Sequence, residues 1–184
     1  MGKLLSQIFT YLISDFKWTA CLLNQSVHFG FFLQKINLLK DKMDDEASGR
    51  YFVPPGTSLH DSLVINAHHA LAYLINIPVI PGRPYRLFCA WSMFIGLASL
   101  KWLDQKGQGN KIKPRETYYL VNQINLLIDD NRALEKLFNS YLPEQYKESQ
   151  RTHSESIKQI PTWFKTIYDE EQDPINWFEL GVIA

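Results

Sequence analysis

A stripe of polar side chains follows one flank of an otherwise apolar segment near the start of the chain. Its members are three or four residues apart and end in an acidic cluster: Gly30, Gln34, Asn37, Asp41 and Asp45. Because an α-helix turns by about 100° per residue, this spacing places all five within about 100° of arc. The positions beside and opposite the stripe are apolar: Val27, Phe29, Phe31, Phe32, Ile36, Leu38, Leu39 and Met43. A surface helix normally carries a wider polar half of mixed charge, so the pattern predicts acids that face a cavity.

The acids of this stripe suggest a cation site. Carboxylates one helical turn apart repel each other, and moving each one towards an apolar interior costs on the order of several kcal/mol. A bound cation offsets that cost. Hard oxygen ligands select magnesium, manganese or calcium, and magnesium is commonly held by one or two carboxylates together with water and substrate phosphate. The alternative is that Asp41, Asp44 and Asp45 form a solvated helix end.

Three segments, which lie in order along the chain, carry a resemblance to a known family. The first is residues 32–45 with residues 49–54, the second is residues 63–74 with 88–100, and the third is residues 111–115. Together they resemble the squalene and phytoene synthase family over about residues 1–125. The start of the first segment, Phe32 to Asn37, is more similar to squalene synthases than to phytoene synthases.

The resemblance implies an all-α protein, an isoprenoid-synthase-type helical bundle of which this chain holds only the carboxyl-terminal part. It implies a prenyltransferase that condenses two farnesyl diphosphates head to head, giving presqualene diphosphate or a squalene-type product. Departure of diphosphate leaves an allylic carbocation, so such a site needs positive charge around the leaving group and an apolar, aromatic-lined cavity. This chain has both ingredients, since 14% of its residues are aromatic.

Carried over onto this sequence, the family's site residues fall on the stripe. The resemblance implies that Asp41 and Asp45 are ligands of Mg²⁺ and that Asn37 belongs to the same catalytic group. Gln34 and Asn37 would line the region of the diphosphate and the intermediate. Lys40 stands where the family often has arginine and would contact the substrate.

A compact basic cluster precedes the last expected helix. It consists of Lys106, Lys111, Lys113 and Arg115. The resemblance implies that Lys113 and Arg115 reach the substrate phosphate, or NADPH in members that reduce the intermediate. The alternative is a solvated loop.

Two parts of the family pattern have no match here. These are a first aspartate-rich motif on an earlier helix and a tyrosine-bearing segment, and residues 56–62 stand where the family has a longer stretch. A clamp on diphosphate needs ligands from both sides of a cavity. We therefore expect this chain to be completed by a missing amino-terminal half or a partner subunit. The alternative is a non-catalytic relic or interaction module of the same fold.

The composition limits the number of domains, the kinds of partner and the cellular location that we expect. The chain has 184 residues, 46% of them hydrophobic, which suffices for one domain with a core. Its 19 basic and 19 acidic residues give zero formal charge, which argues against nucleic acid as a partner. Cys21 and Cys89 lie in apolar contexts and are expected to pack as small hydrophobes in a reducing cytosol. No run approaches about 18 apolar residues, so we expect no transmembrane segment, and the location is cytoplasmic or peripheral to a membrane.

Apolar spacing predicts helices over about residues 2–21, 24–46, 58–77, 85–103 and 116–140. Asn24 or Ser26 would cap the second helix, and Ser48-Gly49 would end it, with Gly49 in the left-handed conformation. Pro54-Pro55-Gly56 predicts a turn.

The chain is expected to divide into three parts. Residues 1–142 form the synthase-like helices, residues 143–158 a polar linker or exposed helix, and residues 159–184 an aromatic tail. The tail would dock on its own domain, touch a partner or meet a bilayer interface.

Small residues and histidines complete the pattern. Ser92, Gly96 and Ser99 form a small-residue face that admits a close neighbour or a ligand. His68 and His69 are adjacent, so they point about 100° apart and do not suit one metal ion. The other histidines are expected at the surface or at the edge of the core: His28, His60 and His153.

Overall fold

The described part of the protein is all-α, as predicted. The computed structural model describes residues 9–10, 13, 16, 18–52, 59–106 and 111–143, without the side chains at 60, 61, 104 and 106. Within these ranges there are five long helices and no strands. They are α2 (Ala20–Ala47), α3 (His60–Asn76), α4 (Arg83–Lys106), α5 (Pro114–Leu127) and α6 (Asn131–Tyr141).

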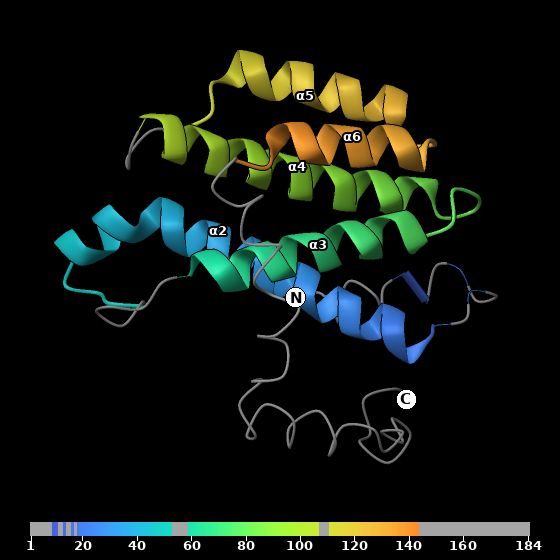
Figure 1. Ribbon diagram of the computed structural model, residues 1–184, viewed down its shortest axis with the longest axis horizontal. Helices are drawn as coiled ribbons and strands as arrows, with labels where there is room; N and C mark the ends of the chain where they lie inside the picture. Colours follow the sequence, from blue (N-terminus) through green and yellow to red (C-terminus); the bar gives the residue numbers. More distant parts are fainter. Residues whose placement is uncertain are drawn as a thin grey trace, which may run out of the picture. The chain divides into compact units, whose positions relative to one another are not determined.

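Helix α4 lies in the middle of the bundle (Figure 1). It contacts α2 and α3 on one side and α5 and α6 on the other, and α2 packs along α3. All five helices belong to one compact unit, Met1–Lys147, and Glu148–Ala184 forms a second unit. The predicted linker beyond Pro143 and the aromatic tail lie outside the described residues, as does the predicted turn at residues 54–56.

Helix α2 starts earlier than the sequence suggested. Thr19 is its cap: its side-chain oxygen accepts a hydrogen bond from the Leu22 backbone nitrogen at 3.1 Å. The prediction that Asn24 or Ser26 caps this helix is wrong, because both lie inside it. The expected end of the first helix at residue 21 is also wrong, since residues 18 and 19 are not helical. At the other end the prediction holds, because Gly49 follows the helix with a φ of 73°.

The expected single helix over residues 116–140 is two helices. Asp130 separates them, because its carboxylate accepts from the backbone nitrogens of Arg132 at 2.9 Å and Ala133 at 3.1 Å and so starts α6. Apolar spacing continues across this break, which is why periodicity alone missed it. Helix α5 begins at Pro114, so Arg115 lies in its first turn and not in the predicted loop.

The buried side of α2 faces α3 and α4. Its apolar members are Leu22, Phe29, Phe32 and Ile36. A Cβ added at Gly96 of α4 would lie 3.4 Å from the Phe32 ring and 3.6 Å from Ile36. The predicted small-residue face therefore admits a neighbouring helix at this position. Cys89 is buried as expected, whereas Cys21 is exposed, which corrects the prediction for that residue.

A buried guanidinium on α4 joins the ends of α3, α5 and α6. Arg86 of α4 is 1% exposed and donates to the carbonyl oxygens of Leu74, Ile75 and Ile77, at 3.1, 3.3 and 2.7 Å. It also donates to the Ile128 carbonyl at 2.8 Å and to the Asn131 side chain. These acceptors lie at the carboxyl ends of α3 and α5, where helix carbonyls lack partners within their own helix. Arg86 thus fixes both helix ends against α4.

Among the described helices, none is both long and apolar enough to cross a bilayer.

Candidate functional site

The polar stripe faces outward. Gln34, Asn37 and Asp41 are exposed, as is the neighbouring Asp44, whereas Gly30 and Asp45 are half-buried. The expectation that these side chains line a cavity within this chain is therefore wrong. The reason is geometric: the stripe is centred about 120° around α2 from the line of buried residues, and neither α3 nor α4 covers that flank. We refer to Gln34, Asn37, Asp41 and Asp45 as the acidic flank.

The two predicted metal ligands have different surroundings. Asp41 is exposed and makes no ion pair among the described residues. Asp45 is one turn further on, with a side chain that is 17% exposed, and its carboxylate pairs with Arg50 at 2.9 Å. The Arg50 backbone nitrogen also donates to the Asp45 carbonyl at 2.8 Å. The segment after α2 therefore folds back onto one of the two acids and leaves the other open.

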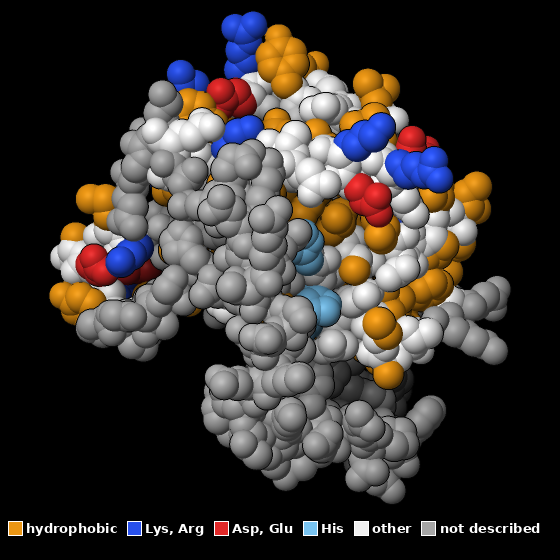
Figure 2. Space-filling view, in the orientation of Figure 1, with side chains coloured by type: hydrophobic (Ala, Val, Ile, Leu, Met, Phe, Trp, Pro, Cys, Tyr) orange, Lys and Arg blue, Asp and Glu red, His pale blue; other side chains and the backbone are white. Residues whose placement is uncertain are grey.

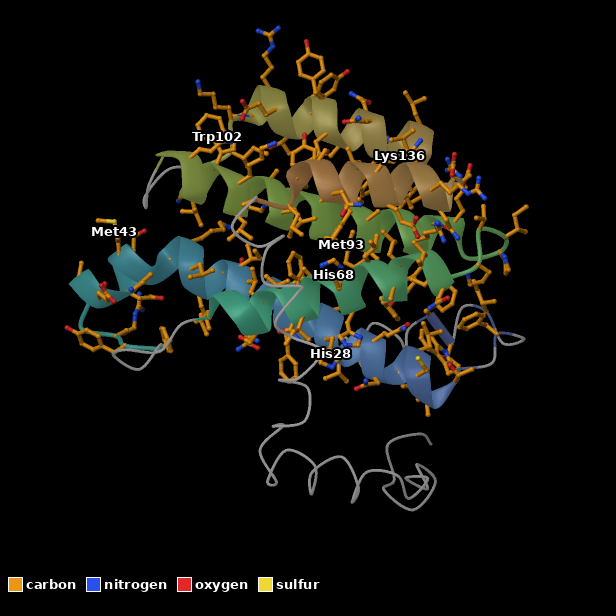
Figure 3. The ribbon with its side chains drawn as sticks, in the orientation of Figure 1. His28, Met43, His68, Met93, Trp102 and Lys136 are labelled. Carbon is orange, nitrogen blue, oxygen red and sulfur yellow. The ribbon has the colours of Figure 1, made fainter. Side chains whose placement is uncertain are left out.

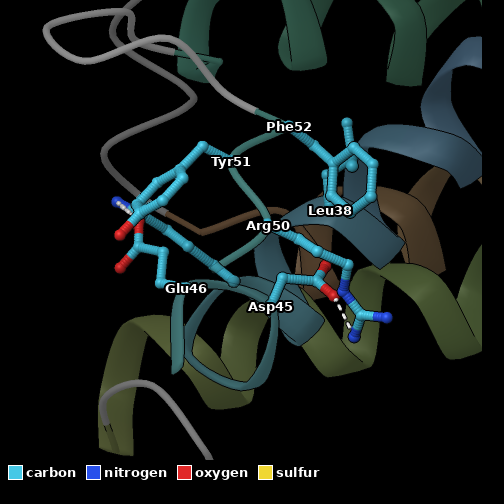
Figure 4. A pocket seen from close by; sticks show the side chains of 7 residues that line it. Leu38, Asp45, Glu46, Arg50, Tyr51 and Phe52 are labelled. Carbon is cyan, nitrogen blue, oxygen red and sulfur yellow. Dashed lines mark ion pairs between the residues drawn. The ribbon is translucent and has the colours of Figure 1, made fainter. Parts of the chain in front are cut away.

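A pocket lies at the carboxyl end of α2 (Figure 4). Its lining residues come from the last turns of α2 and the segment that follows: Leu38, Lys42, Asp45, Glu46, Arg50, Tyr51 and Phe52. The charges in it are paired, Asp45 with Arg50 and Lys42 with Glu46 at 3.8 Å. The pocket contains Asp45 but not Asp41. It therefore does not bring the two predicted metal ligands together.

The described residues fit a magnesium ion only in part. They hold no group of three or more histidine, cysteine or acidic side chains that could ligate a metal. Two carboxylates at positions i and i+4 still match the one or two protein ligands that magnesium commonly keeps when water and phosphate complete its shell. Asp41 and Asp45 could hold such an ion once Asp45 leaves Arg50. The ion would then neutralise the charge of a departing diphosphate.

The remaining predicted substrate residues lie on two elements. Lys40 is on α2 and is half-buried. Lys113 and Arg115 are exposed at the start of α5, where Lys113 Nζ lies 5.7 Å from the centre of the Trp102 ring and Arg115 lies 5.5 Å from that of Tyr119. Trp102 and Met43 are at the same end of the long axis (Figure 3). The basic pair and the acidic end of α2 thus share one end of the molecule.

Sequence reasoning missed a second polar cluster, on another flank of α2. Lys35 and His28 of α2 meet Asn66 of α3 through hydrogen bonds of 2.6 and 2.7 Å. The signal was present, because His28 and Lys35 are seven residues apart and share a helix flank, as do Asn66 and His69 at three residues. His28 was predicted at the surface or at the edge of the core, and it is half-buried at the contact between α2 and α3.

Comparisons of the chain with models of known protein families, with curated proteins and with solved structures give no match.

Proposed function

We propose that this chain supplies the carboxylate helix of a head-to-head prenyltransferase of squalene synthase type. In this proposal Asp41 and Asp45 bind Mg²⁺, which bridges to the diphosphate of farnesyl diphosphate. Gln34, Asn37 and Lys40 contact the substrate. The observation that carries the proposal is the continuous acidic flank, in which Asp41 makes no ion pair with any described residue and lies in line with the two amides.

The helix that bears the flank is held firmly enough to position ligands. Phe29, Phe32 and Ile36 are each at most 3% exposed and fix α2 against its neighbours. Of the flank, Gln34, Asn37 and Asp41 remain exposed. Because a diphosphate clamp needs ligands on both sides, the second wall would come from residues other than the described ones, in the same protein or in a partner subunit. An uncovered flank is what such an arrangement requires.

Lys113 and Arg115 extend the proposal to a reducing enzyme. Both are exposed cations at the end of the molecule where α2 finishes, and either can pair with a phosphate group. They would bind a substrate phosphate or the phosphate of NADPH. A product as apolar as squalene would leave to a bilayer, which suits a cytoplasmic protein in peripheral contact with a membrane.

One observation favours a second candidate function, a non-catalytic interaction module of the same fold. Asp45 already pairs with Arg50, and Lys42 pairs with Glu46, so three of the charged groups beside Asp41 are satisfied without a ligand. A helix end of this kind is an ordinary solvated surface. The two candidates differ in whether magnesium and diphosphate bind at Asp41 and Asp45.

A thermal shift experiment tests the proposal. Mg²⁺ together with a non-hydrolysable farnesyl diphosphate analogue should raise the Tm of the full chain by about 5 °C at ligand concentrations far above Kd. Asp41→Asn with Asp45→Asn should abolish the increment. Glu46→Gln with Glu135→Gln is the matched control, because it also removes two helix carboxylates and should keep the increment. No increment in the wild type, or equal increments in all three proteins, would contradict the proposal.

A further inference from the structure

A cluster of nitrogen-bearing side chains joins α2 to α3 on the flank away from the acids. We call Lys35, His28, Asn66 and His69 the Lys35 cluster. Lys35 Nζ donates to Asn66 Oδ1 at 2.6 Å, and Asn66 Nδ2 lies 2.7 Å from His28 Nδ1. The His28 ring stacks on the His69 ring with centroids 4.2 Å apart. Lys35 is six residues from Asp41, which places it about 120° around the helix from that acid.

The direction of the hydrogen bonds fixes the state of His28. A lysine ammonium has three N–H donors and no acceptor, so Asn66 must turn its Oδ1 towards Lys35. Its Nδ2 then donates to His28 Nδ1, which leaves the ring proton of His28 on Nε2. The cluster therefore offers the remaining Lys35 donors, His28 Nε2–H and a ring N–H of His69. Lys35 and the free nitrogen of His28 therefore only donate, whereas neutral His69 has one donor and one acceptor nitrogen.

The cluster has no counter-charge among the described residues. Lys35 makes no ion pair there, and the titratable groups that interact with His28 are His69 and Lys35. Burial, with His69 and Lys35 adding repulsion, lowers the pKa of His28 to about 4, and burial lowers that of Lys35 to about 8. His68, the next residue of α3, contacts Phe138 of α6, and burial with nearby His69 lowers its pKa too. At neutral pH the cluster holds a half-buried ammonium with no anion beside it.

Solvent reaches the cluster. His28 and His69 are half-buried. Among the described residues, Trp18 Nε1 is the buried side-chain nitrogen that lacks a hydrogen-bond partner, so each ring nitrogen of the two histidines either has a partner or is open to solvent. His28 and His68 lie near the middle of the molecule in Figure 3, and Figure 2 shows histidine side chains at the surface in the same place. A small solute can therefore approach the donors from outside.

We propose that the Lys35 cluster binds a small oxyanion of the phosphate class, either free phosphate or a phosphate monoester. An oxyanion with several acceptor oxygens matches the free ammonium donors of Lys35, the Nε2–H of His28 and the ring N–H of His69. Its charge offsets the half-buried ammonium and favours protonation of His69, whose pKa burial otherwise lowers. This site is separate from the acidic flank and does not depend on the prenyltransferase proposal.

The test is a titration of the full chain with inorganic phosphate in EDTA near neutral pH, followed by NMR of the histidine rings. We expect saturable shifts of the His28 and His69 resonances and a rise in the pKa of His69. Lys35→Met should weaken phosphate binding by roughly tenfold or more. Asn66→Asp should abolish phosphate binding, because the new carboxylate pairs with Lys35 and so supplies the counter-charge that the phosphate would otherwise provide.

Lys42→Met is the matched control. It removes the same charge from the same flank of α2, two turns further on, and should bind phosphate as the wild type does. Asp41→Asn with Asp45→Asn should also keep the phosphate response, which separates this site from the magnesium proposal. Absence of saturable shifts in the wild type, or equal binding by wild type and Lys35→Met, would overturn the inference.

A second arm identifies the source of the phosphate group. Phosphatidylcholine vesicles with and without phosphatidic acid are sedimented with the protein. Lys35-dependent sedimentation with phosphatidic acid alone indicates a lipid headgroup. Saturable phosphate shifts without such sedimentation indicate a soluble phosphate compound.

Discussion

Arg86 and the acidic flank show two ways in which this protein carries charge. Arg86 is buried and donates to four backbone carbonyls and one side chain, from residues of α3, α5 and α6. Asp41 is exposed and has no ion-pair partner among the described residues. The Arg86 guanidinium makes hydrogen bonds that hold helix ends together, whereas the Asp41 carboxylate makes no ion pair with a described residue. The fold therefore depends on the first group and leaves the second available to a ligand.

The comparison also explains how Arg86 is satisfied without a direct ion pair among the described residues, with Asp129 adding only a nearby negative charge. The carboxyl ends of α3 and α5 present carbonyl oxygens that carry partial negative charge, and the planar guanidinium reaches several of them at once. No such dipole faces Asp41, which lies in the interior of α2 rather than at an end. A ligand cation is the group that could satisfy it.

Replacing Arg86 should have the largest effect on stability. Arg86→Met removes the guanidinium donors of four carbonyl oxygens, of which those of Leu74 and Ile75 keep one other donor each. We expect a loss of about 3–5 kcal/mol in the free energy of unfolding. Arg86→Lys should lose a similar amount, because one ammonium cannot reach acceptors on two helix ends. Urea denaturation followed by circular dichroism measures both.

Arg83→Met is the control for that experiment. Arg83 is exposed and pairs with Asp129 at 3.0 Å, so its replacement should cost less than about 1 kcal/mol. Similar losses for Arg83→Met and Arg86→Met would show that the buried network does not hold the helix ends.

Acidification should have a smaller effect, through the histidines between α2 and α3. The pKa values of His28, His68 and His69 are all lowered in the folded protein, that of His28 to about 4. Below the ordinary value of about 6.5 the unfolded chain binds more protons than the folded one. The contribution of these neutral histidines to the free energy of unfolding is therefore fully present above about pH 6.5 and is lost as the pH falls towards about 4.

His28→Gln isolates the contribution of one histidine, because its side-chain oxygen can still accept from Asn66. Between about pH 6.5 and pH 4, we expect the variant to lose about 1 kcal/mol less of its free energy of unfolding than the wild type loses. This figure allows for the partial exposure of His28. Unfolding in phosphate-free buffers across this range measures the difference. A pH profile identical to that of the wild type would show that His28 titrates normally in the folded protein.

The sequence predicted helices well and their junctions poorly. Apolar spacing located the helical regions, and Gly49 marked the end of α2, because both signals are local. The start of α2 at Thr19 and the break at Asp130 were missed, since several polar residues compete for each cap and only tertiary packing decides among them. The third local signal was the stripe. Its spacing correctly placed these polar residues on one side of one helix, but it could not show which elements pack beside them.

The site was harder to predict for the same reason. That Gln34, Asn37 and Asp41 share a flank follows from spacing, but their exposure depends on where α3 and α4 pack. The Arg50 to Asp45 pair and the contact of Lys35 with Asn66 join residues whose proximity depends on turns and helix pairing. Periodicity contains no such information.

Neutralising the acidic flank should have the smallest effect on the unliganded protein. Asp41→Asn with Asp45→Asn loses the partly exposed pair of Asp45 with Arg50 but relieves repulsion between two carboxylates one turn apart. We expect the free energy of unfolding to change by less than about 0.5 kcal/mol, or to rise slightly. Urea denaturation in EDTA measures it, with Arg50→Met to report the ion pair alone. A loss above about 2 kcal/mol would show that the fold itself uses these acids. The contrast with Arg86 would then fail, because both charges would serve structure and neither would be reserved for a ligand.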